Sequence, residues 1–165
     1  MKFKFILTLC LIVLLNKNSV LASPFSADNL SRDPLSDLSP TGEIQEIFKL
    51  GSTYTDLQRQ RRLAEIKGKV VQWVLPVYEV REEGDNCYEV VFTTAKVGKH
   101  QTVSVTAYVE PRTEQELRFI ESLRTGDFVK VKGRLTGLTK PFSRSLIMFP
   151  ATFLVSEPSS EGNSK

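Results

Sequence analysis

The sequence predicts a mainly β domain, a small barrel of five strands with one helix between the third and fourth strands. Three observations lead to this prediction. Short runs rich in β-branched and aromatic residues follow one another from residue 69 onward and are separated by polar turns. A helical pattern interrupts these runs once, over residues 113–123, and another precedes them, over residues 55–66.

The leading helix is predicted over residues 55–66, TDLQRQRRLAEI. Thr55 and Asp56 are both suitable N-cap residues, because their side-chain oxygens can accept from the free amides of the first turn. Gly68 is typical of a helix end. Apolar residues recur at helical spacing between these two signals, which indicates that one side of the helix is buried.

Three strands in a row are predicted next, over residues 69–80, 87–94 and 102–109. Short polar turns join them into a meander, and the third alternates clearly between apolar and polar residues, so one of its faces should be buried. Trp73 is expected in the core. Pro76 cannot donate to a strand ladder, so either it bends the first strand or that strand is irregular.

A capping-box pattern opens the helix over residues 113–123. The fourth strand is predicted over residues 128–135, with Phe128 closing the barrel, and the fifth over residues 146–155. Pro150 within the fifth strand indicates an edge or a bulge. Three strands, one helix and two strands are the order of the five-stranded OB-type barrel.

Residues 1–22 have the pattern of a cleavable signal peptide. Lys2 and Lys4 form a basic start, an apolar run follows, and Ala22 is a small residue at the expected cut. The apolar run is too short for a membrane-spanning helix, which needs roughly 20 residues. We therefore expect cleavage near Ala22 and a periplasmic or secreted protein with no membrane span.

The remaining chain divides into three parts by composition. Residues 23–50 are rich in turn-forming dipeptides and are predicted to be a flexible linker with a short helix from residue 43. Residues 51–155 form the predicted OB-type domain with its leading helix. Residues 156–165, SEPSSEGNSK, are predicted to be a disordered tail.

The charge of the chain gives little information about a partner. The full sequence has 22 Lys and Arg against 19 Asp and Glu, but the excess of basic residues lies entirely in the predicted signal peptide. The processed chain is neutral, so its net charge favours neither nucleic acid nor an anionic membrane. It keeps one cysteine, Cys87, which we expect to be a buried thiol rather than an intermolecular bridge.

The stretch TDLQRQRRLAEIKGKVVQWVLPVYEV, residues 55–80, resembles the entry to small exported bacterial OB-fold proteins grouped as tRNA-anticodon-like. The passage LRTGDFVKVKGRL, residues 123–135, is similar to the entry into the fourth strand of OB folds generally. The resemblance covers residues 55–155 and implies an OB barrel, but no activity, because the function of the group is largely undefined. That group usually has Gly two residues after the Trp, where this chain has Leu75.

The sequence contains no recognisable catalytic arrangement. Its one histidine, His100, lies in a Gly/Lys turn, and Cys87 is the one cysteine outside the predicted signal peptide, so there is no zinc set and no nucleophilic triad. The acidic residues of the predicted hairpin tip, typical of a solvated turn, are Glu79, Glu82, Glu83 and Asp85. We predict no enzymatic activity, no metal and no cofactor.

OB barrels often bind single-stranded nucleic acid through aromatic residues on strands two and three and through basic residues that track the phosphates. Tyr88 and Tyr108 are the candidate aromatic residues, and Lys130, Lys132 and Arg134 share one face of the fourth strand. A nucleic-acid site would require this basic stripe to be continuous with exposed rings of both tyrosines. Weaker candidates of the same kind are Phe92, Lys96 and Lys99.

A second basic surface is predicted on the leading helix, where Arg59 and Arg62 share a face at spacing i, i+3. It is typical of a solvated helix; an acidic protein or a membrane surface is the alternative.

Taken together, the sequence favours a non-enzymatic exported binding or adaptor module that recognises an envelope protein or glycan. The alternative is single-stranded nucleic-acid binding in DNA transfer or uptake. An exposed apolar patch would favour the adaptor, and a cleft with converging polar groups would favour an enzyme.

Overall fold

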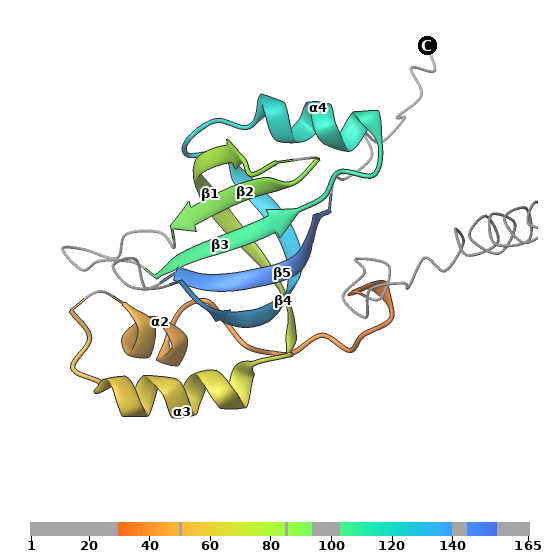
Figure 1. Ribbon diagram of the computed structural model, residues 1–165. Coiled ribbons are helices and arrows are strands. Elements are labelled where there is room, and N and C mark those ends of the chain that lie inside the picture. Colours follow the sequence, from red (N-terminus) through yellow and green to blue (C-terminus); the bar gives the residue numbers. More distant parts are fainter. Residues whose placement is uncertain (1–29, 50, 85, 94–102, 140–144, 155–165) are drawn as a thin grey trace, which may run out of the picture.

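The computed structural model describes residues 30–49, 51–84, 86–93, 103–139 and 145–154 (Figure 1). The predicted signal peptide and C-terminal tail lie outside these residues, as do Asp85, Lys96, Lys99 and His100. The strands are β1 (Val70–Glu82), β2 (Tyr88–Thr93), β3 (Ser104–Val109), β4 (Phe128–Leu138) and β5 (Ser145–Phe153). The helices are α2 (Glu43–Phe48), α3 (Asp56–Ile66) and α4 (Glu114–Ser122).

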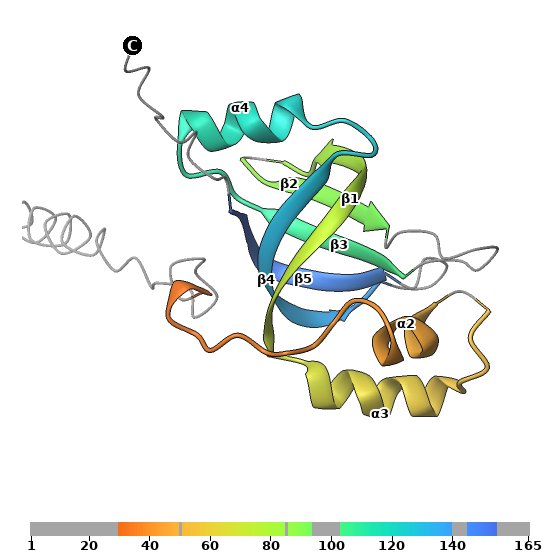
Figure 2. The same ribbon diagram turned by 180° about the vertical axis from the view of Figure 1, so that it is seen from behind.

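The five strands close into a barrel in the order β1-β2-β3-β5-β4. Neighbouring strands are antiparallel except β3 and β5, which are parallel. Helix α4 covers one end of the barrel, and α2 and α3 lie at the other end (Figures 1 and 2). The chain is therefore mainly β with an OB-type barrel, and the predicted fold class is confirmed.

Alternation along the strands fills the interior. Trp73 is buried, as predicted, and its Nε1 donates to the carbonyl of Leu38 at 2.7 Å. Gly133 lies on the inner side of β4, where a Cβ would stand 3.0 Å from the Cβ of Met148 and 3.1 Å from that of Ala151. A side chain at residue 133 therefore has no room, because β4 and β5 approach closely there.

The two prolines within strands lie where the ladders change. β1 pairs with β4 from Val70 to Pro76 and with β2 from Val77 onward, and the register to β2 shifts directly after Val77. Pro76 thus ends one ladder before the next begins, and β1 remains one bent strand with an irregularity. The ladders from β5 to β3 and to β4 both shift around Pro150, so this proline marks a bulge and not an edge.

The helices begin as their sequences predict. Thr55 caps α3 with a reciprocal capping box to Gln58. At α4 the Thr113 hydroxyl accepts from the amide of Glu116 at 3.1 Å, while the Glu116 carboxylate accepts from the amide of Arg112 at 2.7 Å. The second bond goes one residue further back than in the standard box.

The predicted flexible linker is the main difference between sequence and structure. From Leu30 to residue 49 this segment, called the N-terminal arm below, packs on the barrel instead of standing free: Leu30 is buried, and the amide of Ser36 donates to the Val70 carbonyl at 2.8 Å. The short helix predicted inside it is confirmed as α2. The arm belongs to the domain because α2 places three apolar side chains at spacing i, i+3, i+4 in the core, those of Ile44, Ile47 and Phe48.

Candidate functional site

The basic stripe predicted on β4 is divided by its contacts. Lys130, Lys132 and Arg134 do share the outer face of β4, because the residues between them are buried. The Arg134 guanidinium, however, is held by the Asp33 carboxylate of the N-terminal arm and donates to the Gly68 carbonyl at 2.8 Å. Within the part of the chain that the structure describes, neither lysine forms an ion pair. Only the two lysines are therefore available to a ligand.

Apolar side chains surround Lys130 on the barrel exterior. Val74 of β1 is its partner in the ladder on one side, and on the other side the amide of Leu154 donates to the Lys130 carbonyl at 2.9 Å. Phe128 precedes it on the same outer face, opposite Pro76. The exposed fractions are 68% for Phe128, 58% for Val74 and 39% for Leu154.

We call the surface formed by Val74, Phe128, Lys130, Lys132 and Leu154 the β4 face; β4 and β1 lie in front in Figure 2. The prediction that Phe128 closes the barrel is wrong. Its side chain has the same parity as Lys130 and so points outward, away from the buried Val129. The same parity could have revealed Phe128 in the sequence, but nothing in the sequence alone places Val74 and Leu154 beside Lys130.

The two candidate tyrosines lie on opposite sides of the sheet. The β2–β3 register pairs Tyr88 with Val109 and Glu89 with Tyr108, so the side chain of Tyr88 points inward and packs against the core, whereas that of Tyr108 points outward. Partial burial raises the pKa of Tyr88, and the charges of Glu82 and Glu121 add to the shift. The predicted pair therefore forms no common stacking surface, and Phe92 is fully buried.

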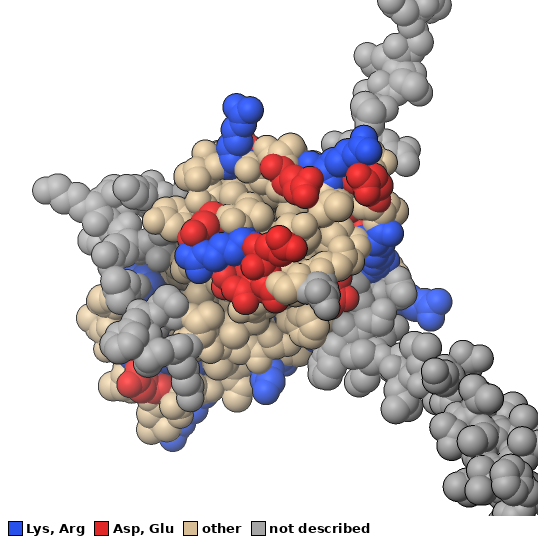
Figure 3. All heavy atoms as spheres, turned by 45° about the horizontal axis from the view of Figure 1, so that its top comes forward, with Lys and Arg blue, Asp and Glu red and all other residues tan. Residues whose placement is uncertain are grey.

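Tyr108 lies on an acidic surface. We call the outward-pointing residues Glu89 of β2 and Tyr108 of β3, with Glu79 and Arg81 from the adjoining end of β1, the β2–β3 face. Arg81 is bound by the carboxylate of Glu79, and its Nη1 lies 3.4 Å from Glu89 Oε2. Partial burial, followed by the charge of Glu89, raises the pKa of Tyr108. Figure 3 turns the α4 end forward and shows acidic side chains gathered around basic ones on this side. A phosphate here would approach carboxylates, which is unfavourable.

The basic face predicted on the leading helix is not free to bind. Arg59 is buried and donates to the Tyr54 carbonyl and the Asp56 carboxylate. Arg62 donates to Glu65 at 2.7 Å and to Glu43 of the N-terminal arm at 2.6 Å, and the hydrogen bond to Glu65 is the main reason that its pKa is raised. Both arginines pair with an acidic residue three positions away on α3, and Arg62 also links α3 to the N-terminal arm.

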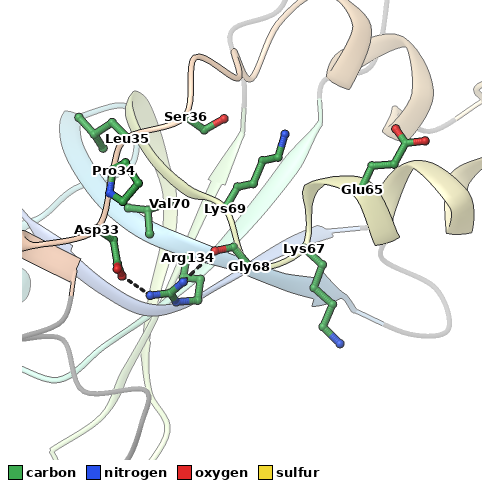
Figure 4. Close-up of a pocket in the computed structure, with 10 residues that line it drawn as sticks. All are labelled: Asp33, Pro34, Leu35, Ser36, Glu65, Lys67, Gly68, Lys69, Val70 and Arg134. Carbon is green, nitrogen blue, oxygen red and sulfur yellow. Dashed lines mark hydrogen bonds and ion pairs between the residues drawn. The ribbon is translucent and has the colours of Figure 1, made fainter.

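A groove of about 560 Å³ lies where the N-terminal arm crosses the start of β1 (Figure 4). Asp33 and Arg134 meet inside it, and Lys67 and Lys69 extend away from each other on either side of Gly68. Ser36, the one hydroxyl residue of its lining, accepts from the Leu38 amide at 3.4 Å. Among the described residues no base reaches that hydroxyl, so the groove is a seam between arm and barrel with no catalytic pair.

The described residues contain no group of three His, Cys, Asp or Glu side chains that could hold a metal ion. Cys87, expected to be buried, is half-buried, and burial followed by the charges of Glu110 and Glu83 raises the pKa of its thiol. A thiol with a raised pKa is a poor nucleophile at neutral pH.

Searches of protein families and of curated proteins find no match to this chain. In the described part of the chain, every helix is too short or too polar to cross a bilayer.

Proposed function

We propose that this protein is a non-enzymatic exported binding module that recognises a protein partner in the envelope through the β4 face. The observation that carries the proposal is the exposure of Val74 on β1, Phe128 on β4 and Leu154 directly after β5, side by side on a closed barrel. Adjacent exposed apolar side chains of this size typically mark a contact surface. The export in this proposal rests on the pattern of residues 1–22.

The composition of the β4 face favours a protein partner over a glycan. A glycan site usually needs flat aromatic rings with several hydrogen-bonding groups, whereas here two of the three exposed apolar side chains are the aliphatic Val74 and Leu154. Protein interfaces typically have an apolar centre with a polar rim. Lys132, with Gln72 and Thr152 opposite it in the two ladders, forms such a rim.

Single-stranded nucleic acid is supported less well. The two tyrosines are separated, the β2–β3 face is acidic, and Arg134 is engaged by the N-terminal arm. Among the described residues named above, Phe128 and the two lysines are what remains of a stacking and phosphate-binding site.

The proposal can be tested by affinity capture from an envelope extract. We expect Phe128→Ser to reduce the amount of the specific partner at least about fivefold, because an apolar anchor at the centre of an interface typically contributes more than 1 kcal/mol. The matched control is Tyr108→Ser on the β2–β3 face, which should capture as much partner as the wild type. Equal capture by all three proteins, or loss only with Tyr108→Ser, would contradict the proposal.

A further inference from the structure

We infer that the β4 face binds an acidic segment of its partner, in which carboxylate side chains flank an apolar one. The inference rests on the proposed function and adds the chemistry of the partner. It follows from the position of Lys130 and Lys132 beside exposed apolar side chains, and from the lack of an ion pair between these lysines and any described carboxylate.

The position of Lys130 determines how far apart the apolar side chain and the carboxylate of the partner must be. Val74 is the neighbour of Lys130 in the ladder to β1, where side chains directly opposite each other have Cβ atoms about 5 Å apart. On the other side the amide of Leu154 donates to the Lys130 carbonyl. An apolar side chain of the partner that rests on Val74 and Phe128 therefore lies within reach of the Lys130 ammonium group. A carboxylate next to that side chain can meet the ammonium group at the edge of the apolar contact.

Within the described part of the chain the two lysines of the β4 face form no ion pair, in contrast to the guanidinium groups of Arg134 and Arg81. Arg134, on the same outer face of β4, is held by Asp33, and Arg81 of β1 is held by Glu79 and Glu89. Among the described residues, no carboxylate lies within ion-pair distance of Lys130 or Lys132. No described residue therefore competes with an external anion for these two positive charges.

The other side of the barrel adds selectivity. An acidic segment placed on the β2–β3 face would meet Glu79 and Glu89, so like charges disfavour it there. A basic segment would be directed to the β2–β3 face instead. The distribution of charge therefore selects which side of the barrel an acidic segment approaches.

A pair of labelled peptides tests this chemistry directly. One alternates Leu and Phe with Asp and Glu, and the other replaces every acid by Lys. Each peptide is titrated into the ¹⁵N-labelled protein. The protein is purified in the form that the producing cells yield after any processing. We expect the acidic peptide to shift the amide resonances of Val74, Phe128, Lys130 and Leu154, and to bind more weakly as salt is added.

Charge variants sharpen the test. Lys130→Glu with Lys132→Glu should weaken the acidic peptide about tenfold, since two exposed ion pairs become repulsive. Glu89→Lys, a charge reversal on the other face, should leave its affinity at the β4 face unchanged.

Three results would overturn the inference. One is the absence of binding by the acidic peptide, or shifts confined to the β2–β3 face or the groove. Another is equal or tighter binding of the basic peptide at the β4 face. The third is a single-stranded oligonucleotide, or vesicles of anionic lipid, binding at the same resonances while the acidic peptide does not. If partner capture still depends on Phe128 in any of these cases, the proposed function stands and only the acidic chemistry is wrong.

Discussion

The β4 face and the β2–β3 face lie on opposite sides of one barrel. They differ in whether their charged side chains already form ion pairs with other described residues. On the β2–β3 face Arg81 is bound by Glu79 and Glu89, and Tyr108 is the neighbour of Glu89 in the ladder. On the β4 face the two lysines are unpaired with any described residue and stand among exposed apolar side chains. Strands two and three commonly carry the ligand in OB barrels. Under the proposed function, the opposite side carries the ligand in this barrel.

The largest change in the free energy of unfolding is expected from a substitution on the inner side of β4, beneath the β4 face. Gly133→Val should destabilise the fold by roughly 3 kcal/mol, because its side chain would overlap Met148 and Ala151. Lys132→Ala, one residue earlier and on the outer side, should change stability by less than about 0.5 kcal/mol. Urea denaturation measures both. Equal effects would mean that the two sides of β4 are not divided between fold and binding.

A smaller effect is expected where the stripe of β4 meets the N-terminal arm. Arg134→Met should cost about 0.5–1 kcal/mol, since the partly exposed ion pair with Asp33 is lost. Hydrogen exchange of the Ser36 amide, which donates to Val70, should accelerate at the same time. Lys132→Met is the control and should leave this exchange rate unchanged. Slow exchange in both variants would show that Arg134 does not hold the arm.

The fold was largely predictable because its elements follow from periodicity. Alternation in the strands, helical periodicity, the capping residues and the turn residues are local signals, and they were sufficient for the five strands, the three described helices and their order. The N-terminal arm was missed because its turn-forming dipeptides are typical of a linker. What attaches it to the barrel is burial of α2 and contacts to Val70, Trp73 and Arg134, all distant in sequence.

The candidate site was only partly predictable. Which side chains share a strand face follows from parity, so the stripe of β4 was found, and Phe128 could have been assigned to it. Which residues of neighbouring strands lie beside each other depends on register, and a shift of one residue reverses every side chain. Tyr88 and Tyr108 were therefore grouped although they point to opposite sides. The engagement of Arg62 by Glu43 comes from a segment 19 residues away.

A still smaller effect is expected when the exposed apolar side chains of the β4 face are removed. Phe128→Ser with Val74→Thr should leave the free energy of unfolding within about 0.5 kcal/mol of the wild-type value, because both side chains are largely in contact with water already. Urea denaturation of this variant and of Tyr108→Ser makes the comparison. A loss of several kcal/mol would show that the β4 face is part of the core and not a binding surface.

The smallest effect concerns pH and the β2–β3 face. The pKa of Tyr108 is raised, so the contribution of this group to stability is complete below the pKa of tyrosine in the unfolded chain, about 10, and is lost as the pH rises through the folded value. Glu89→Gln should move the pKa of Tyr108 back toward its ordinary value. Ultraviolet titration, with Tyr108→Phe to identify the residue, measures the shift. An unchanged titration would mean that Glu89 does not act on Tyr108.

Photocrosslinking in the cell compares the two faces most directly. A photoreactive phenylalanine analogue is placed at residue 128 on the β4 face or at residue 108 on the β2–β3 face, with export and expression checked to be equal. We predict a discrete crosslinked protein species from residue 128 and none from residue 108. The same species from residue 108 alone, or no species from either, would contradict the assignment of the β4 face as the binding surface.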